Sequence, residues 1–233
     1  MALVTSVGQA AKGSNVFPEA VLWDMDGVLI DSEPGYNLIT GELIRSLGYE
    51  FGECEIEKVT GVSYRNISTI LDFKEPPEKI SQLYAEALMS AVCTHVHSLI
   101  DGVTDFLEYF DAKGVQMAIG SSSPRELVEF VVKEFKLSPW MRLSVTGSDT
   151  ENGKPAPDIY LMCAERLGVP PSKCLVIEDS KNGIIAAKDA GMSVLAYSGT
   201  NRYNLDLSGA DLVFESYSAD SLTEIDRWIA SRQ

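Results

Sequence analysis

Positive charge is scarce in this chain of 233 residues. It has 19 lysines and arginines against 34 aspartates and glutamates, which gives a formal net charge of −15 at pH 7. Such a charge opposes binding to nucleic acid and to anionic membranes, so we expect neither as a partner. Its simplest role is to keep the protein soluble. A small anionic substrate would need local positive charge, such as a metal ion, to enter the protein.

Long hydrophobic runs and paired cysteine motifs are also missing. No apolar run approaches the roughly 20 residues of a membrane span. The 4 cysteines show no CxxC motif and no Cys/His metal-ligand spacing. Most of them stand beside apolar residues in helical or strand patterns, which predicts buried free thiols in a reducing compartment. Residues 1–17 resemble neither a secretory nor a mitochondrial signal. We therefore expect a flexible extension there and a cytoplasmic protein.

The order of helical and strand patterns predicts an α/β fold. A short apolar strand lies in residues 18–33, and residues 34–99 show helical spacing with no convincing strand. From residue 100 to residue 233, strands alternate with helices, which is typical of βαβ units. We expect a Rossmann-like parallel sheet with helices on both faces, formed by 18–33 and 100–233. An all-helical domain of residues 34–99 would be inserted into it.

The apolar strand near the N-terminus ends at two aspartates. Val21–Trp23 runs into Asp24, then Met25, Asp26 and Gly27. Open α/β sheets place their chemistry at the carboxyl ends of strands. There, one carboxylate can attack an electrophile while its neighbour transfers protons. Taken alone, the stretch could equally be a strand followed by an ordinary polar turn.

Hydroxyls and a lysine follow two later strands. Ser121, Ser122 and Ser123 come after an apolar strand and before a helix, where hydroxyls and free backbone N–H groups can bind an anion. A serine that only caps the helix would explain them as well. Lys154 stands between a glycine and a proline, which presents its side chain rigidly. By itself it could be a surface lysine in a loop.

A second acidic pair, Glu178 and Asp179, ends another apolar strand. Carboxylates in such a place are costly unless a cation neutralises them. A hard divalent metal would do so, and Mg²⁺ suits one or two carboxylates together with phosphate oxygens. The pair is therefore a candidate site for such an ion.

These four motifs, in this order, resemble those of the haloacid dehalogenase superfamily of phosphotransferases. They are Asp-x-Asp-Gly, a serine after a strand, Gly-Lys-Pro, and Glu-Asp-Ser before a helix. The similarity extends from about residue 17 to the end of the chain. It implies that residues 34–99 are the cap domain that this superfamily places after the first strand.

The resemblance also implies a role for each polar residue. Asp24 would be the nucleophile that forms an aspartyl-phosphate, and Asp26 would be the acid for the leaving alcohol and the base for water. Lys154 would bind the phosphoryl group and keep Asp24 ionised. The implied catalytic residues are Asp24, Asp26, Ser121 and Lys154; the phosphate-binding residues are Met25, Asp26, Ser121, Ser122 and Lys154. The implied metal ligands are Asp24, Asp26 through its backbone carbonyl, Asp179, and Glu178 directly or through water.

Within the superfamily, Asp26 favours phosphorus chemistry, because halide release needs no proton donor. Similarity to β-phosphoglucomutase leaves a second possibility. The cap histidine of that enzyme is matched here by Tyr36, and its cap arginine is matched by Tyr64, with Arg65 one residue later. Pro124 and Arg125 replace an asparagine and a lysine that the mutase carries after its serine motif.

We therefore predict a Mg²⁺-dependent phosphatase, a phosphoric monoester hydrolase that acts on a small phosphorylated metabolite such as a sugar or polyol phosphate. Intramolecular phosphoryl transfer of the β-phosphoglucomutase type is the alternative. An inactive binding protein on the same fold is a second alternative, although a binder would not need Asp26. A cap that must open favours a monomer.

Overall fold

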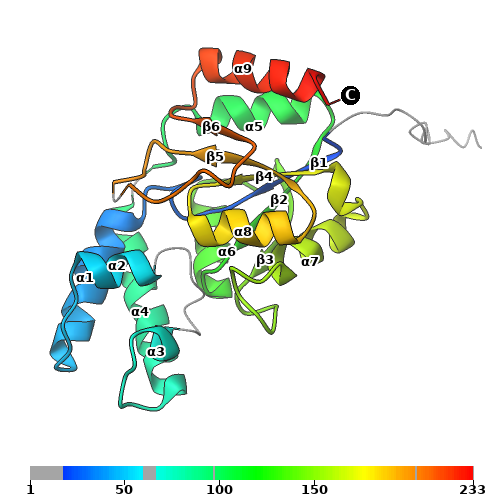
Figure 1. Cartoon of the computed structure of the whole chain (residues 1–233). Coiled ribbons are helices and arrows are strands. Elements are labelled where there is room, and N and C mark those ends of the chain that lie inside the picture. Colours follow the sequence, from blue (N-terminus) through cyan, green and yellow to red (C-terminus); the bar gives the residue numbers. More distant parts are fainter. Residues whose placement is uncertain (1–17, 60–66, 97, 203, 233) are drawn as a thin grey trace, which may run out of the picture.

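The computed structural model describes residues 18–59, 67–96, 98–202 and 204–232 (Figure 1). The expected extension at residues 1–17 and the positions of Tyr64 and Arg65 lie outside these ranges.

A parallel sheet forms the centre of the molecule. Its six strands have the order β3-β2-β1-β4-β5-β6, and every neighbouring pair is parallel. The strands are β1 (Ala20–Trp23), β2 (Gln116–Ser121), β3 (Met141–Thr146), β4 (Cys174–Glu178), β5 (Ser193–Tyr197) and β6 (Leu212–Phe214). The predicted parallel α/β architecture is confirmed.

Helices cover both faces of this sheet (Figure 1). On one face lie α5 (Val103–Ala112), α6 (Arg125–Glu134) and α9 (Ala219–Ala230). On the other lie α7 (Asp158–Leu167) and α8 (Lys181–Asp189), with a short 3-10 turn at Pro171–Lys173 before β4. Side chains of β1 alternate between the two cores, as the pleat of a strand requires: Val21 and Trp23 enter the first, Ala20 and Leu22 the second. All four are fully buried, which explains why β1 reads as one continuous apolar run.

Between β1 and α5, the chain forms a separate group of helices beside the sheet (Figure 1). They are α1 (Glu33–Ser46), α2 (Glu53–Val59), α3 (Ile67–Ile70) and α4 (Pro77–His95). The described parts of this segment, 33–59 and 67–95, contain no strand. Helix α4 buries Ile80, Tyr84 and Leu88 on one face, which is the helical spacing that the sequence shows.

Buried thiols were predicted for most of the four cysteines, but only two are buried. Cys163 and Cys174 are buried free thiols, but Cys54 and Cys93 are exposed. The prediction was wrong for Cys93 because Val92 takes the buried position on α4, and the next residue on a helix points about 100° away from its predecessor.

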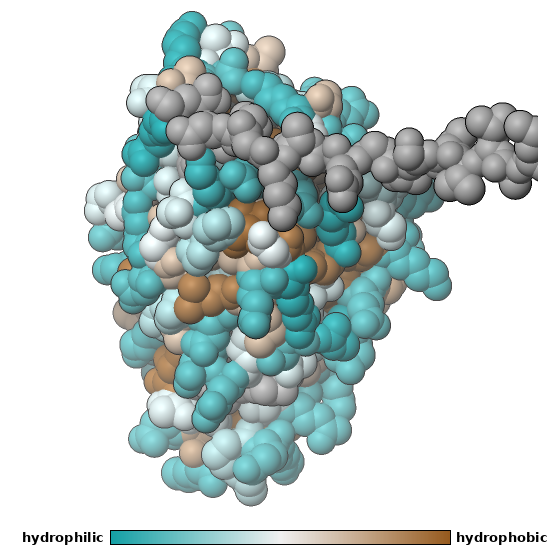
Figure 2. Space-filling view, turned by 90° about the vertical axis from the view of Figure 1, so that its right-hand side faces the viewer, coloured by the Kyte–Doolittle hydropathy of each residue, from teal (hydrophilic) through white to brown (hydrophobic). Residues whose placement is uncertain are grey.

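The surface agrees with the composition. Hydrophilic side chains cover much of the face in Figure 2, with apolar side chains between them. None of the helices within the described ranges has the length and apolar character that crossing a membrane requires.

Candidate active site

The strand order brings the predicted motifs together. Strand β1 lies between β2 and β4, and Trp23 is in register with both Ile119 and Ile177. The backbone N–H of Asp24 donates to the carbonyl of Ile177 at 3.0 Å, which sets Asp24 beside Glu178. The ends of β1, β2 and β4 therefore meet at one edge of the sheet.

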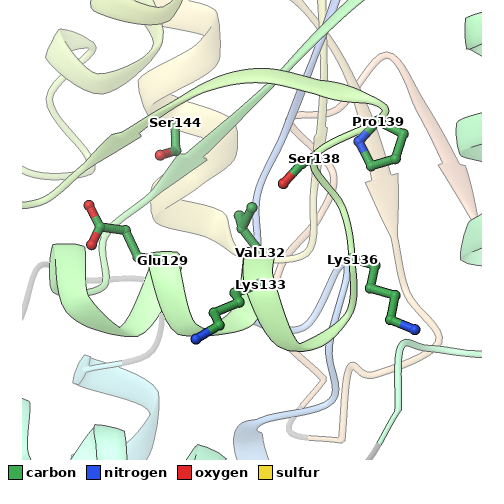
Figure 3. A pocket seen from close by; sticks show the side chains of 7 residues that line it. All are labelled: Glu129, Val132, Lys133, Lys136, Ser138, Pro139 and Ser144. Atoms are coloured by element: carbon green, nitrogen blue, oxygen red, sulfur yellow. The ribbon is translucent and has the colours of Figure 1, made fainter.

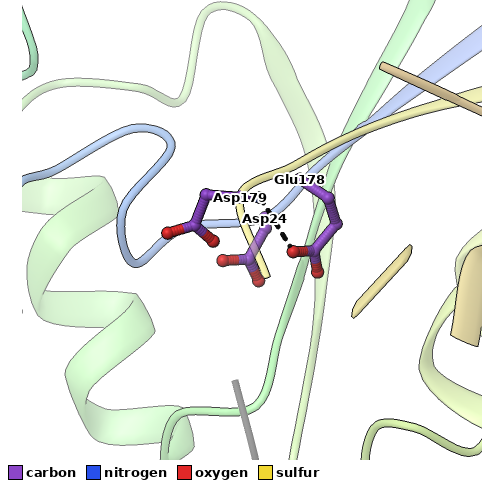
Figure 4. A group of neighbouring side chains, drawn as sticks. All are labelled: Asp24, Glu178 and Asp179. Atoms are coloured by element: carbon purple, nitrogen blue, oxygen red, sulfur yellow. Dashed lines mark hydrogen bonds between the residues drawn. The ribbon is translucent and has the colours of Figure 1, made fainter. Parts of the chain in front are cut away.

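Three carboxylates gather at this edge (Figure 4). Asp24, Glu178 and Asp179 each offer an oxygen, and these oxygens lie within 4.8 Å of one another. Gly27 makes room for this cluster, because a Cβ at that position would overlap the carboxylate of Asp179. Its φ of +78° also favours glycine. Gly27 of the Asp-x-Asp-Gly motif is thus required because Asp179 of the Glu-Asp-Ser motif fills the space beside it.

Lys154 reaches the cluster from the loop between β3 and α7. Its Nζ lies 2.5 Å from Asp24 Oδ1 and 2.6 Å from Glu178 Oε1, and the residue is only 1% exposed. Burial by itself would lower the pKa of Lys154, but the charges of Asp24 and Glu178 outweigh it and hold that pKa above its ordinary value. The site therefore contains a permanent ammonium group.

This single ammonium does not balance three carboxylates. Burial raises the pKa of Asp24 to about 8. The positive charge of Lys154 opposes this rise in part, while the negative charges of Glu178 and Asp26 add to it. Burial and the charges of Glu178 and Asp24 also hold the pKa of Asp179 well above its usual range. The cluster thus has an excess of about two negative charges when ionised. A divalent cation with a preference for oxygen ligands fits this set of residues.

Glu178 differs from its neighbours because protein donors already occupy its oxygens. Oε1 accepts from Lys154 and from the Tyr160 hydroxyl at 2.7 Å. Oε2 accepts from the backbone N–H of Asp179 at 3.0 Å, and from the N–H and hydroxyl of Ser180 at 3.1 and 3.0 Å. Although burial acts to raise it, these contacts lower the pKa of Glu178. A carboxylate offers about four lone-pair sites, so these five donors saturate Glu178.

Asp26 lies among hydroxyl groups rather than in the acidic cluster. Its Oδ1 accepts from Ser32 at 2.8 Å and from Tyr36 at 2.6 Å. Its Oδ2 accepts from Ser123 at 2.6 Å and, more weakly, from Ser121 at 3.5 Å. The buried Ser121 hydroxyl in turn accepts the backbone N–H of Ser123 at 3.0 Å. The structure thus places Ser121 beside Asp26, as two neighbouring strand ends predict.

The two remaining predicted residues lie in the turns after their strands. Met25 is fully buried, and its carbonyl accepts from the backbone N–H groups of Leu29 and Ile30 at 2.9 and 3.1 Å. Ser122 is half-buried between β2 and α6. Their contacts with a phosphate stay predictions.

Sequence reasoning missed several of these contacts. The hydroxyl of Tyr160 holds Glu178, and its ring lies 4.8 Å from Lys154 Nζ. In the sequence this tyrosine looks like a packing residue of α7, and nothing distinguishes it. Ser32 and Ser123 are ordinary turn and cap residues by type, so their bonds to Asp26 carry no sequence signal either.

A separate surface hollow lies between α6 and the start of β3, and none of the motif residues lines it (Figure 3). It holds Glu129, Val132, Lys133, Lys136, Ser138, Pro139 and Ser144. It is therefore distinct from the site at the strand ends.

Comparisons with known proteins agree with this geometry. The model of the haloacid dehalogenase-like hydrolase family matches residues 21–197. The chain is 34% identical over 178 residues to a phosphorylated carbohydrates phosphatase of Thermotoga maritima, covering 75% of this chain and 82% of that protein. It is 28% identical over 213 residues to hexitol phosphatase B of Escherichia coli O157:H7, covering 88% of this chain and 93% of that one.

Among solved structures, the fold is similar to β-phosphoglucomutase of Clostridium difficile. The TM-score is 0.77 at 22% identity, over 91% of this chain and 99% of that one. At this identity the likeness concerns the fold alone. The family match, the related sequences and the gathered motifs confirm the resemblance that the sequence suggested: the chain belongs to the haloacid dehalogenase-like hydrolases.

Proposed function

We propose that this chain is a Mg²⁺-dependent phosphatase that hydrolyses a small phosphate monoester, such as a sugar or polyol phosphate. The observation that carries the proposal is the contact of Lys154 with Asp24 inside a cluster of three carboxylates, with Asp26 two residues away. The printed names of the two related sequences, phosphatases of phosphorylated carbohydrates and of hexitols, support the substrate class.

In the first step, a carboxylate oxygen of Asp24 attacks phosphorus and forms a P–O bond. The P–O bond to the alcohol breaks, and the alcohol oxygen takes a proton from Asp26. Ser121 and Lys154, with Met25 and Ser122, bind the oxygens of the phosphoryl group. The contact with Lys154 also favours the ionised, nucleophilic form of Asp24.

In the second step, water attacks phosphorus and gives a proton to Asp26. The bond between phosphorus and the Asp24 oxygen breaks, which releases inorganic phosphate and restores both aspartates. Positioning and electrostatic stabilisation account for most of the catalysis in phosphoryl transfer. This chain supplies them from the ends of adjacent strands and from the Lys154 loop.

Mg²⁺ would be held by Asp24, Asp179 and the backbone carbonyl of Asp26. Glu178 would contact it through water, because its own oxygens already accept five hydrogen bonds. When bound, the ion offsets the negative charge of the carboxylates and of the phosphoryl oxygens.

The helices of residues 34–99 would form a cap domain over the core of residues 18–33 and 100–233. Closure of such a cap excludes bulk water and completes the site. We propose a small phosphorylated metabolite as the partner of this site, and a monomer in the cytoplasm as the working form.

The β-phosphoglucomutase alternative needs cationic groups that hold a second phosphate. Arg125, which follows the serine motif after Pro124, is paired with Asp149 and, at 3.8 Å, with Glu129. The guanidinium of Arg125 is therefore already paired with acidic residues of the core domain rather than with a second phosphate. This pairing favours hydrolysis over phosphoryl transfer within a bisphosphate.

A panel of sugar and polyol phosphates, incubated with Mg²⁺, tests the proposal. We expect release of inorganic phosphate, and its loss in Asp24→Asn. Conversion of β-glucose 1-phosphate to glucose 6-phosphate without phosphate release would establish the mutase instead. Binding of these compounds with neither reaction would establish an inactive binding protein.

A further inference from the structure

We propose that Tyr36 is a positioning residue for Asp26, and that it acts from the first helix of the inserted segment. The inference rests on the proposed function, in which Asp26 gives a proton to the leaving alcohol. Tyr36 itself belongs to none of the four motifs.

The carboxylate of Asp26 is held on both of its oxygens by different parts of the chain. Oδ1 accepts from Tyr36 of α1 at 2.6 Å and from Ser32, directly before α1, at 2.8 Å. Oδ2 accepts from Ser123 of the core at 2.6 Å. Because donors on both sides fix the torsion of the side chain, removing the Oδ1 contacts would free the carboxylate to rotate. Tyr36 makes the shorter of those two contacts.

The chemistry of these donors suits a group that must both give and take a proton. Every hydrogen bond to the Asp26 side chain within the described residues comes from a hydroxyl. A hydroxyl donates to a carboxylate and can also accept from a carboxylic acid. A lysine or arginine could only donate, and would hold Asp26 in its ionised form. The hydroxyls therefore keep Asp26 oriented through both halves of the proposed reaction.

Packing within the helical segment fixes Tyr36. The preceding Gly35 lies so close to α4 that an added Cβ would be 2.9 Å from the Cβ of His95. The Thr40 hydroxyl donates to the backbone carbonyl of Tyr36, and α1 packs along α4, whose Tyr84 is buried. Burial and the adjacent Asp26 charge hold the pKa of Tyr36 well above its usual value, so its hydroxyl stays neutral. The packing of α1 against α4 thus sets the position of the Tyr36 hydroxyl.

The test is Tyr36→Phe in the full chain with Mg²⁺, measured on two substrates. One is the alkyl phosphate from the panel that the protein hydrolyses best, whose leaving group needs a proton. The other is p-nitrophenyl phosphate, whose leaving group departs as a stable anion. We expect kcat/KM for the alkyl phosphate to fall about tenfold or more, and kcat/KM for p-nitrophenyl phosphate to stay nearly unchanged.

Tyr49→Phe is the matched control. Its hydroxyl also lies in the helical segment, but it contacts Glu75 and the backbone of Lys74 instead of Asp26. We expect this variant to behave as the wild type on both substrates. If Tyr36→Phe does not fold, as judged by thermal unfolding, Ser32→Ala removes the other Oδ1 donor and should show the same selective loss.

Equal losses on the two substrates, or no loss on either, would overturn the role of Tyr36 while the phosphatase proposal stands. A wild-type protein that releases phosphate from neither substrate would refute the proposed function itself, and the role of Tyr36 with it. In an Asp26→Asn background, Tyr36→Phe is expected to cause no further loss on the alkyl phosphate. An additional loss there would contradict action through Asp26.

Discussion

Replacing Lys154 by methionine tests the electrostatics of the site directly. Methionine has a similar length and no charge, so the change removes the ammonium that bonds Asp24 and Glu178 at 2.5 and 2.6 Å. Removing one partner of a buried ion pair leaves an uncompensated charge, which costs about 3–5 kcal/mol of unfolding free energy. For a chain of this size, each kcal/mol shifts Tm by about 2–4 °C, so we expect a decrease of about 6–20 °C without metal.

Thermal unfolding in a chelating buffer measures this change. Lys113→Met is the matched control, since Lys113 pairs with Asp226 at 2.8 Å but is 47% exposed. An exposed pair contributes about 0–1 kcal/mol, so the control should lose at most about 4 °C. We also expect Mg²⁺ to stabilise Lys154→Met more than the wild type, because the cation would then offset the charge of the three carboxylates without a competing ammonium. The reasoning is refuted if Lys154→Met loses no more than the control.

Three further predictions concern the same cluster. The pKa of Asp24 is raised from 3.8 to about 8, and that of Asp179 is also raised, so between these values the folded metal-free protein binds more protons than the unfolded chain. The stability of the metal-free protein should therefore fall as pH rises through this window, and Mg²⁺ should make it less dependent on pH. Chemical denaturation at several pH values, with and without Mg²⁺, measures both effects. Gly27→Ala should abolish Mg²⁺-dependent phosphatase activity, because the new Cβ of alanine would displace the carboxylate of Asp179. The control is Gly114→Ala, which is also at positive φ but has open space around it. This control should keep its activity and lose only about 1 kcal/mol of stability. Tyr160→Phe removes one donor to Glu178 and should lower the unfolding free energy by about 1–3 kcal/mol, measured by denaturant titration; an unchanged midpoint would show that the bond adds nothing.

The gathering of the motifs could be predicted from the sequence because it depends on topology alone. Asp24, Ser121 and Glu178 each follow or end an apolar strand, and the carboxyl ends of parallel strands lie at one edge of a sheet. Periodicity and alternation identify those strands without any knowledge of side-chain directions. The same argument gave the helical segment between β1 and α5.

The surroundings of Asp26 and Glu178 could not be predicted in this way. Tyr36 and Tyr160 reach these carboxylates from helices whose rotation is set by packing in three dimensions. For the same reason the exposure of Cys93 was missed: a one-residue step on a helix separates a buried side chain from an exposed one. Apolar spacing indicates the buried face of a helix, but not which neighbouring group a polar side chain on that helix reaches.

The saturated hydrogen bonding of Glu178 has a consequence for how the site exchanges its ion. The backbone N–H groups of Asp179 and Ser180 are tied to Glu178 by the protein's own contacts, so the turn keeps its shape whether or not a cation is present. Little conformational entropy is then lost when an ion enters. On the proposed mechanism, an ion would then enter and leave between turnovers without refolding of the turn, and its affinity would depend on charge and ligand geometry.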